Sequence, residues 1–419
     1  MGIISKMTRT GLRLLGSPNS TSNGQRPRVL FVSHEATRTG APKIILNILK
    51  HFHQKCDIQC ETILHNGGHL LEEFQAYSDA PVDCLNAPRK SSESLQRKVT
   101  RIVAREKNNS PILAICNSME SRFISEVLSN QNLPIVSLIH ELPSSYSEAD
   151  YQKVYDNSDR IVFPVHAVRD AADSTATIPS GKGIVLPQGL LQSDFGKNIT
   201  TDVARAQIRK ELSVPSDSFL VLGCGTLDLR KGIDHFAAIA RRVVHANRSK
   251  NPIHFIWVGE GPRWTHSPYH YIKLDLDKSG ANAHVHFIGE REDVEPYFVG
   301  SDVFLMASRV DPFPCVIHEA MATGLPVVTF ANSGGAQEAV AGGAGIIVPY
   351  ADYEQASGII RMLSTQPEVA AGIRERSAQR ILTRYQFEDY GDKLIDVCEA
   401  LINRQIRSEI RIYQHRSAA

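Results

Sequence analysis

Residues 302–331 read DVFLMASRVDPFPCVIHEAMATGLPVVTFA, and this stretch decides the fold class. It holds two apolar runs, 303–308 and 326–331, whose length is typical of buried strands. Two prolines interrupt the loop after the first run, and helical character then continues up to Gly324. A strand, a helix and a second strand in this order predict a parallel strand pair with a crossover helix.

The same alternation recurs along most of the chain. Short apolar runs predict strands at 28–34, 60–65, 111–118, 134–141, 160–166, 183–189, 219–226, 253–262, 284–290, 303–308 and 326–331, with helical patterns between most of them. We therefore predict an α/β protein with two doubly wound, Rossmann-like domains facing across a cleft. The expected divisions are a flexible basic tail at 1–26, domains at 27–195 and 196–385, and a helical segment at 386–419 that crosses back to the first domain.

The composition is that of an ordinary soluble globular protein. Of the 419 residues, 42% are hydrophobic and 22% charged, and the formal net charge of +1 argues against nucleic acid as a partner. The seven cysteines are scattered, which favours reduced thiols in a cytoplasmic protein. No apolar run is long enough to span a membrane, and the basic N-terminus is compatible with peripheral contact at the inner face of one.

Candidate site residues come from the loops that follow the strands, because doubly wound sheets bind ligands beyond the carboxyl ends of their strands. After the first strand, Gly40 allows close backbone approach just before a helix start, whose free amides suit a phosphate. Arg230 and Lys231 follow the first strand of the second half and suit a diphosphate, although a solvated charge pair is the alternative. His140 follows another strand and can donate a hydrogen bond or accept a proton.

Asp311 and Glu319 flank the loop with the two prolines and have seven residues between them. Asp311 lies in the loop, and Glu319 is expected about one turn inside the following helix. Carboxylates accept paired hydrogen bonds from neighbouring hydroxyls, which suits sugar and ribose rings. The alternative is an acid pair that only complements the helix dipole, but Glu319 lies too deep in the helix for that effect to be strong.

These motifs together resemble one family, the retaining, nucleotide-sugar-dependent glycosyltransferases of family 4, which have the GT-B fold. The resemblance spans roughly residues 220–350 and is weaker in the first half. It rests on GTLDLRKG at 225–232, WVGEGP at 257–262, FIGEREDVEPYFVGSDVFLMAS at 287–308, and DPFPCVIHEAMATGLPVVTFANSGGAQEAV at 311–340. The last stretch is similar to the family's pair of acids with seven residues between them and to the run that follows.

The resemblance implies a role for each candidate residue. Glu319 would hold the ribose, Ile288 and Gly289 would face the base, and Arg230 and Lys231 would bind the diphosphate, which Gly40 would approach from the other half. Asp311 would bind hydroxyls of the donor sugar, and amides near Phe313, Cys315 and Val316 would line its pocket. His140 would lie by the donor sugar and the reacting oxygen. The sequence departs from the family pattern at three positions. Asp311 is one methylene shorter than the usual Glu, Thr226 stands in the donor site where many members have Arg, and Pro314 lacks an N–H.

The resemblance implies transfer of a sugar from a nucleotide sugar, most simply a UDP- or GDP-sugar, to a saccharide or lipid-linked acceptor with retention, in polysaccharide or glycoconjugate biosynthesis. No cofactor and no metal are expected, and the DLD motif at 275–277 lies away from the strand ends. Two alternatives remain: a non-catalytic nucleotide-sugar-binding protein and a nucleotide-sugar epimerase of the same fold. An NAD enzyme is disfavoured because Asp228 replaces the third glycine of the fingerprint that starts at Gly223.

Overall fold

The computed structural model describes residues 26–86, 92–106, 109–247 and 251–417, and divides the chain into two compact units. Unit 1 combines the chain up to Leu191 with the segment from Phe387 onward, and unit 2 runs from Gln192 to Gln386. The domain boundaries predicted from the sequence were 195/196 and 385/386, and the two units divide at 191/192 and 386/387. The basic tail predicted for 1–26 lies, apart from its last residue, outside the described residues.

Unit 1 is built on a seven-stranded sheet in the order β3-β2-β1-β4-β5-β6-β7, whose neighbouring strands are all parallel. Its strands are β1 (Arg28–Ser33), β2 (Gln59–Leu64), β3 (Asp83–Cys84), β4 (Pro111–Asn117), β5 (Ile135–Leu138), β6 (Arg160–Phe163) and β7 (Gly183–Val185). Its α-helices are α3 (Gly40–Lys55), α4 (Leu71–Ala76), α5 (Glu93–Val103), α6 (Arg122–Ser129), α7 (Glu148–Asp156), α8 (His166–Thr175) and α17 (Phe387–Ser417).

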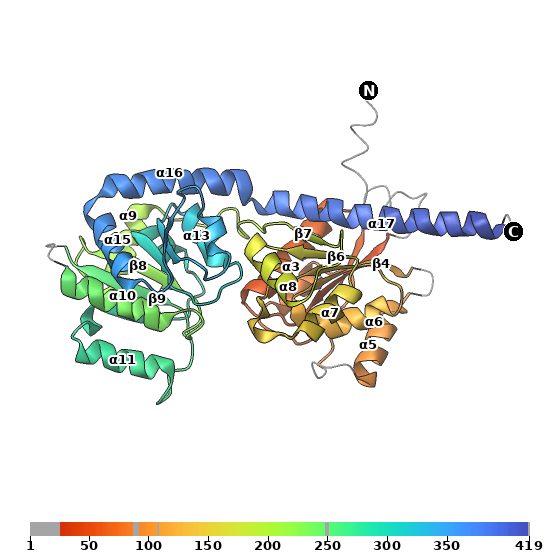
Figure 1. Cartoon of the computed structure of the whole chain (residues 1–419), viewed down its shortest axis with the longest axis horizontal. Helices are drawn as coiled ribbons and strands as arrows, with labels where there is room; N and C mark the ends of the chain where they lie inside the picture. The colour runs from red at the N-terminus through yellow and green to blue at the C-terminus, as the bar shows by residue number, and fades with distance from the viewer. Residues whose placement is uncertain (1–25, 87–91, 107–108, 248–250, 418–419) are drawn as a thin grey trace, which may run out of the picture. The chain divides into compact units, whose positions relative to one another are not determined.

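Unit 2 repeats this plan with a six-stranded parallel sheet in the order β10-β9-β8-β11-β12-β13. Its strands are β8 (Phe219–Cys224), β9 (Ile253–Val258), β10 (Val285–Gly289), β11 (Val303–Met306), β12 (Val327–Phe330) and β13 (Ile346–Val348). Its α-helices are α9 (Thr201–Leu212), α10 (Ile233–Ala246), α11 (Pro268–Lys278), α12 (Glu295–Gly300), α13 (Cys315–Ala322), α14 (Ala336–Ala339), α15 (Tyr353–Thr365) and α16 (Pro367–Arg384). Figure 1 shows helices packed around the sheet in each unit.

The predicted α/β class with two Rossmann-like domains is confirmed. The central strands form because continuous apolar runs are buried on both faces, as in β1, where all six residues are buried. The sequence missed the edge strands β3 and β13, which are too short to carry a pattern of their own and exist only by pairing with β2 and β12.

The helix α17, which follows unit 2 in the sequence, packs on α3 within unit 1. Gly391 makes this close approach possible, because a Cβ there would lie 2.5 Å from the ring of His51. His51 Nε2 also lies 2.9 Å from Asp392 Oδ1. Two residues of one helical turn therefore fix α17 on α3.

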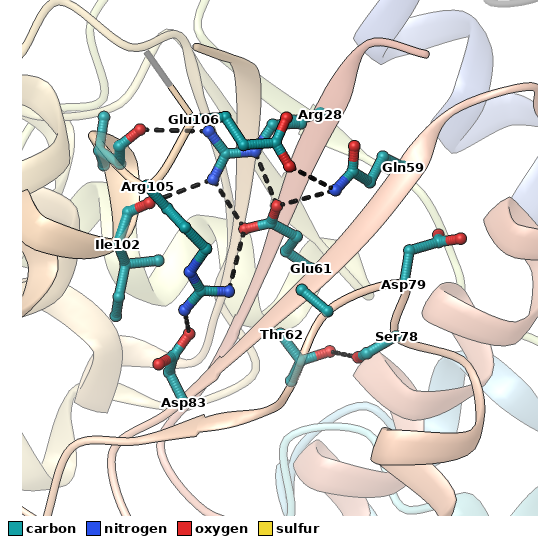
Figure 2. Close-up of polar contacts among 12 residues, drawn as sticks. Arg28, Gln59, Glu61, Thr62, Ser78, Asp79, Asp83, Ile102, Arg105 and Glu106 are labelled. Carbon is teal, nitrogen blue, oxygen red and sulfur yellow. Dashed lines mark hydrogen bonds and ion pairs between the residues drawn. The ribbon is translucent and has the colours of Figure 1, made fainter. Parts of the chain in front are cut away.

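A buried ion pair holds the amino ends of β1 and β2 together. Figure 2 shows the Arg28 guanidinium facing the Glu61 carboxylate, with Nε–Oε1 and Nη2–Oε2 distances of 2.7 and 2.8 Å. Arg28 also donates to the carbonyls of Ile102, Val103 and Asn109. Arg28 is 0% exposed, so every one of its donors needs such a partner.

Replacing Arg28 by Met is expected to lower the free energy of unfolding by about 3–5 kcal/mol, because it leaves the buried Glu61 carboxylate without its bidentate partner. Urea denaturation measures the change. The matched control is Arg97→Met. Arg97 is exposed on α5 and makes a long ion pair of 3.9 Å with the exposed Glu93. Equal stabilities for the two variants would contradict a structural role for the buried pair.

Candidate functional site

In unit 2, the predicted site residues lie beyond the carboxyl ends of neighbouring central strands. Arg230 and Lys231 follow β8, and Asp311 follows β11, which pairs with β8. The structure brings Lys231 and Asp311 together: Lys231 Nζ lies 2.5 Å from Asp311 Oδ2. Both side chains are largely buried, with 16% and 7% of their surface exposed. A charge-assisted contact of this kind holds the ammonium and the carboxylate together beyond the carboxyl ends of β8 and β11.

The loop that carries Lys231 is held by a hydrogen bond within the loop and by close packing of Gly232. The amide of Lys231 donates to Asp228 Oδ1 at 2.7 Å, and Gly232 then adopts a φ of 75° in the left-handed region. Gly232 packs so tightly that a Cβ would lie 1.8 Å from the carbonyl oxygen of Ala307. Only glycine fits this turn, because both the backbone angle and the space exclude a side chain.

The loop that carries Asp311 is anchored on the next strand connection. The Asp311 amide donates to the Ser333 carbonyl at 2.8 Å, and Asp311 forms an isolated bridge with Gly334. Gly334 has a φ of 123°, and a Cβ there would lie 1.9 Å from the Asp311 carbonyl oxygen. The position of the Asp311 carboxylate is therefore set by the backbone on both sides of α13.

The remaining cation, Arg230, is exposed and donates from Nη1 to the Val310 carbonyl at 3.3 Å. The Arg230 carbonyl accepts from the Arg309 amide at 2.9 Å, and the Arg309 guanidinium bonds both carboxylate oxygens of Asp234. Arg230 thus lies in the same loop as Lys231, but its side chain is exposed to solvent. Thr226 is exposed in this loop as well.

The helix α13 begins at Cys315, directly after its N-cap Pro314. Cys315, Val316 and Glu319 are half-buried on it, and Phe313 just before it is buried. The Phe313 ring packs on the His318 ring, with centroids 4.7 Å apart. The expectation that a helix starts inside DPFPCVIHE and carries Glu319 in its second turn agrees with these bounds, and the first turn has no acidic residue.

Ile288 and Gly289 end β10, two strands away from β8 in the sheet. Gly289 has a φ of 80°, and its carbonyl accepts from the Gly259 amide at 2.9 Å. A Cβ on Gly289 would lie 3.1 Å from the Glu260 carboxylate. A side chain at position 289 would therefore need a strained backbone and a small shift of the Glu260 side chain. The DLD motif lies on the helix α11, where Asp275 is exposed.

Unit 1 places its two predicted residues around one buried asparagine. Gly40 is the first residue of α3, and His140 follows β5. Asn117, which is 0% exposed at the end of β4, donates from Nδ2 to the Ala41 carbonyl at 3.0 Å. Its Oδ1 lies 2.8 Å from His140 Nε2. Asn117 therefore connects the start of α3 to His140.

This geometry fixes the tautomer of His140. The Asn117 oxygen can only accept, so His140 Nε2 carries the proton and Nδ1 is left with a lone pair. Nδ1 is buried and has no hydrogen-bond partner among the described residues. Burial, and then the nearby His34, lower the pKa of His140 from 6.5 to about 4. A neutral imidazole with a free acceptor nitrogen can take a hydrogen bond from a hydroxyl group.

Glu141, next to His140, was not among the predicted site residues. Its carboxylate accepts from the Ser118 hydroxyl and from the amides of Met119 and His140, the latter two at 3.1 Å. Burial raises the pKa of Glu141, although these hydrogen bonds oppose the shift. Ser118 holds a φ of 77°, an unusual conformation for a residue with a side chain. Asn117 and Ser118 lie at the carboxyl end of the predicted strand 111–118. Their position after an apolar run is the same signal that identified the other candidate residues.

Asn117→Asp is expected to raise the pKa of His140, because a carboxylate in place of the amide oxygen favours the imidazolium. Long-range ¹H–¹⁵N correlation spectra should show a neutral Nε2–H tautomer for His140 in the parent protein at pH 7, titrating near pH 4. Asn247→Asp, on unit 2, is the control and should leave that resonance unchanged. A parent His140 that titrates near its ordinary pKa, or is protonated on Nδ1, would contradict the assignment.

The same shift has a consequence for stability. The folded-state pKa of His140 lies below its unfolded value, so protons bind the unfolded chain more tightly. The neutral imidazole therefore contributes stability that is complete above about pH 6.5 and is lost as the pH falls towards 4. Urea midpoints measured between pH 7 and pH 4 should fall less steeply in His140→Gln than in the parent protein.

Both the fold and one segment of the chain are similar to known glycosyltransferases. The fold is that of the GT-B glycosyltransferases, with two Rossmann-like domains. Residues 218–365, all in unit 2, match the family model described as glycosyl transferases group 1. This segment contains Arg230, Lys231, Asp311 and Glu319, so the residues discussed for unit 2 lie inside it.

Particular relatives are similar over part of their length. The chain is 28% identical over 152 residues to the O-antigen biosynthesis glycosyltransferase WclY of Escherichia coli, covering 36% of this chain and 38% of that protein. It is 26% identical over 190 residues to the lipopolysaccharide core biosynthesis glycosyltransferase LpsE of Rhizobium meliloti, covering 45% of this chain and 52% of that one. These alignments thus span about half or less of each curated relative.

Among solved structures, Anabaena HepE in complex with UDP and glucose superposes with a TM-score of 0.75 at 19% identity, covering 88% of this chain and 98% of HepE. A glycosyltransferase from Rickettsia africae gives a TM-score of 0.76 at 16% identity, covering 90% of this chain and 99% of the other. At this identity the likeness concerns the fold. None of the described helices combines the length and apolar character that a membrane-spanning helix needs.

Proposed function

We propose that the protein is a retaining glycosyltransferase of family 4 that moves a sugar from a nucleotide-sugar donor to a saccharide or lipid-linked acceptor, without a metal or other cofactor, in polysaccharide or glycoconjugate biosynthesis. The observation that carries the proposal is the Lys231–Asp311 pair at the carboxyl ends of β8 and β11, within the glycosyltransferase segment. Further support comes from relatives whose names describe O-antigen and lipopolysaccharide core synthesis, and from a structural neighbour that contains UDP and glucose.

In this proposal, Lys231 and Arg230 bind the diphosphate, Glu319 holds the ribose hydroxyls, and Asp311 holds hydroxyls of the donor sugar. As the bond between the anomeric carbon and the diphosphate oxygen breaks, its electron pair goes to that oxygen. The cations stabilise the growing negative charge. The acceptor oxygen bonds to the anomeric carbon on the same face, and its proton passes to the leaving phosphate. His140 keeps the place by the donor sugar and the reacting oxygen that the family resemblance implies.

The contact between Lys231 and Asp311 favours this course over a double displacement. A carboxylate held at 2.5 Å by an ammonium is a weak nucleophile, because its negative charge is already shared. Incubation with a 2-fluoro nucleotide sugar followed by intact mass spectrometry should therefore show no glycosyl adduct. An adduct on Asp311 would replace the same-face mechanism with a covalent one.

The proposal is tested first by binding. Thermal unfolding is followed with UDP-, GDP-, ADP- and dTDP-sugars, with and without EDTA. One nucleotide class should raise the melting temperature whether or not EDTA is present, and Glu319→Ala should abolish the shift. Lys210→Ala, an exposed lysine on α9, is the control and should keep it. If no nucleotide sugar shifts the transition of the parent protein, the donor-site assignment is wrong.

Binding alone does not separate a transferase from the two alternatives. Release of nucleoside diphosphate that depends on an added saccharide or lipid-linked acceptor is expected for a transferase. An epimerase would change the donor sugar without acceptor, and a non-catalytic protein would shift in melting temperature without turnover. Either of these results would overturn the transferase and keep the nucleotide-sugar site.

A further inference from the structure

Unit 1 contains a cavity of about 720 Å³ that plays no part in the function proposed above. It lies at the amino ends of β5, β6 and β7, whereas Asn117 and His140 lie at the carboxyl ends of β4 and β5. Its polar lining includes Asp159, Arg160, Ser180, Lys182 and Arg404, and Leu401 of α17 contributes apolar surface.

Strand register brings two of the cations together. Ile161 of β6 pairs with Gly183 of β7, and the Ile161 amide donates to the Lys182 carbonyl at 2.9 Å. Arg160 and Lys182 therefore precede paired positions on adjacent parallel strands. A third cation, Arg404, reaches the same cavity from α17, which comes from the far end of the sequence. Like charges gathered in this way repel one another, and an anion between them removes the repulsion.

The one carboxylate in the lining is already used by the backbone. Asp159 Oδ2 accepts from the Ile135 amide at 2.9 Å, which fixes the start of β5. Positive charge consequently predominates in the cavity, with three cations against one carboxylate. Nucleic acid is an unsuitable occupant, because the formal net charge of the whole chain is only +1. A small, highly charged anion fits this local excess.

The turn 179–182 adds further donors at the rim. The Lys182 amide donates to the Pro179 carbonyl at 3.1 Å and closes the turn. Gly181 has a φ of 77° and open space around it, so the turn presents the Ser180 hydroxyl and the Lys182 ammonium without a bulky side chain between them. Lys182 Nζ uses one donor on the Tyr155 carbonyl, at 2.8 Å, and an ammonium has three donors.

We propose that this cavity binds a phosphate-bearing ligand through Arg160, Lys182 and Arg404. A guanidinium matches two phosphate oxygens with its planar fork, and an ammonium adds a point charge. Serine and asparagine side chains in the lining supply neutral hydrogen bonds. The phosphate belongs either to a soluble phosphate ester or to a lipid headgroup, since both present the same oxygens.

Isothermal titration with inorganic pyrophosphate tests the site. The double variant R160Q/K182Q should bind on the order of a hundredfold more weakly, since each of its two lost charged hydrogen bonds costs about one power of ten. Arg97→Gln removes an exposed charge on α5 and should leave the affinity unchanged. Pyrophosphate could also enter the proposed donor site, so the titration is repeated in Lys231→Ala. Binding through this cavity persists in Lys231→Ala and is lost in R160Q/K182Q.

Circular dichroism and thermal unfolding confirm that R160Q/K182Q is folded, and Arg404→Gln offers a second variant at an exposed position. Binding that survives both sets of substitutions, or the absence of saturable binding in the parent protein, overturns the proposal. Sedimentation with phosphatidylglycerol vesicles and with phosphatidylcholine vesicles distinguishes the sources. Retention on the anionic vesicles that is lost in R160Q/K182Q identifies a lipid phosphate, and pyrophosphate binding without such retention identifies a soluble one.

Discussion

Lys231→Ala is expected to lower kcat/KM for sugar transfer by roughly 10²- to 10³-fold, the usual cost of removing one preorganised group that stabilises developing charge. The ammonium is held by Asp311 and by the turn at Gly232, so it costs little to organise when the donor binds. Initial rates with the nucleotide sugar selected by the melting assay measure the effect. The loss should fall on kcat as well as on KM, because negative charge on the diphosphate grows only as the bond breaks.

Arg230→Ala provides the internal comparison. Arg230 is exposed and donates a 3.3 Å hydrogen bond to the Val310 carbonyl, so we expect a smaller loss, on the order of tenfold. Lys210→Ala is the control for charge alone. If Lys231→Ala retained the activity of Lys210→Ala, Lys231 would have only a structural role in pairing with Asp311. A Lys231→Ala protein that loses stability but keeps full activity would lead to the same conclusion.

Gly232→Ala is expected to lower the free energy of unfolding by roughly 2–5 kcal/mol and to abolish donor binding. A residue with a side chain pays about 1–2 kcal/mol for the left-handed φ of 75°. The added Cβ also collides with the Ala307 carbonyl at 1.8 Å, and relief of that overlap must move β11 or the loop that carries Lys231. Urea denaturation and the nucleotide-sugar melting shift measure the two effects.

Gly280→Ala separates the two causes. Gly280, in the same unit, has a φ of 71°, but nothing lies within 4 Å of a Cβ built there. It therefore carries the backbone cost without the collision, and a loss of about 1–2 kcal/mol with unchanged donor binding is expected. Equal losses in Gly232→Ala and Gly280→Ala would show that the close packing against Ala307 contributes nothing.

Much of the fold could be predicted because each central strand is marked by the apolar residues of its own short segment. A buried central strand must be apolar on both faces, so β1, β8 and β11 are recognisable from their own residues. The carboxyl ends of such strands are known once the strands are known, which is why Lys231 and Asp311 could be proposed as parts of one site. The edge strand β13 has only three residues and no pattern of its own, so it depended on its partner β12.

The amino-acid pattern was enough to predict the repeated α/β plan, every strand except β3 and β13, and the post-strand positions of the candidate donor-site residues. Which of these groups lie in contact depends on how distant segments pack in three dimensions. Lys231 and Asp311 are 80 residues apart, and Asn117 bonds Ala41 across 76 residues. Arg404 lines the same cavity as Arg160 and Lys182, although it lies 222 residues after Lys182 (404 − 182) in the sequence. Strand order and register set these contacts, and both arise from the packing of many segments at once, which no single stretch of sequence records.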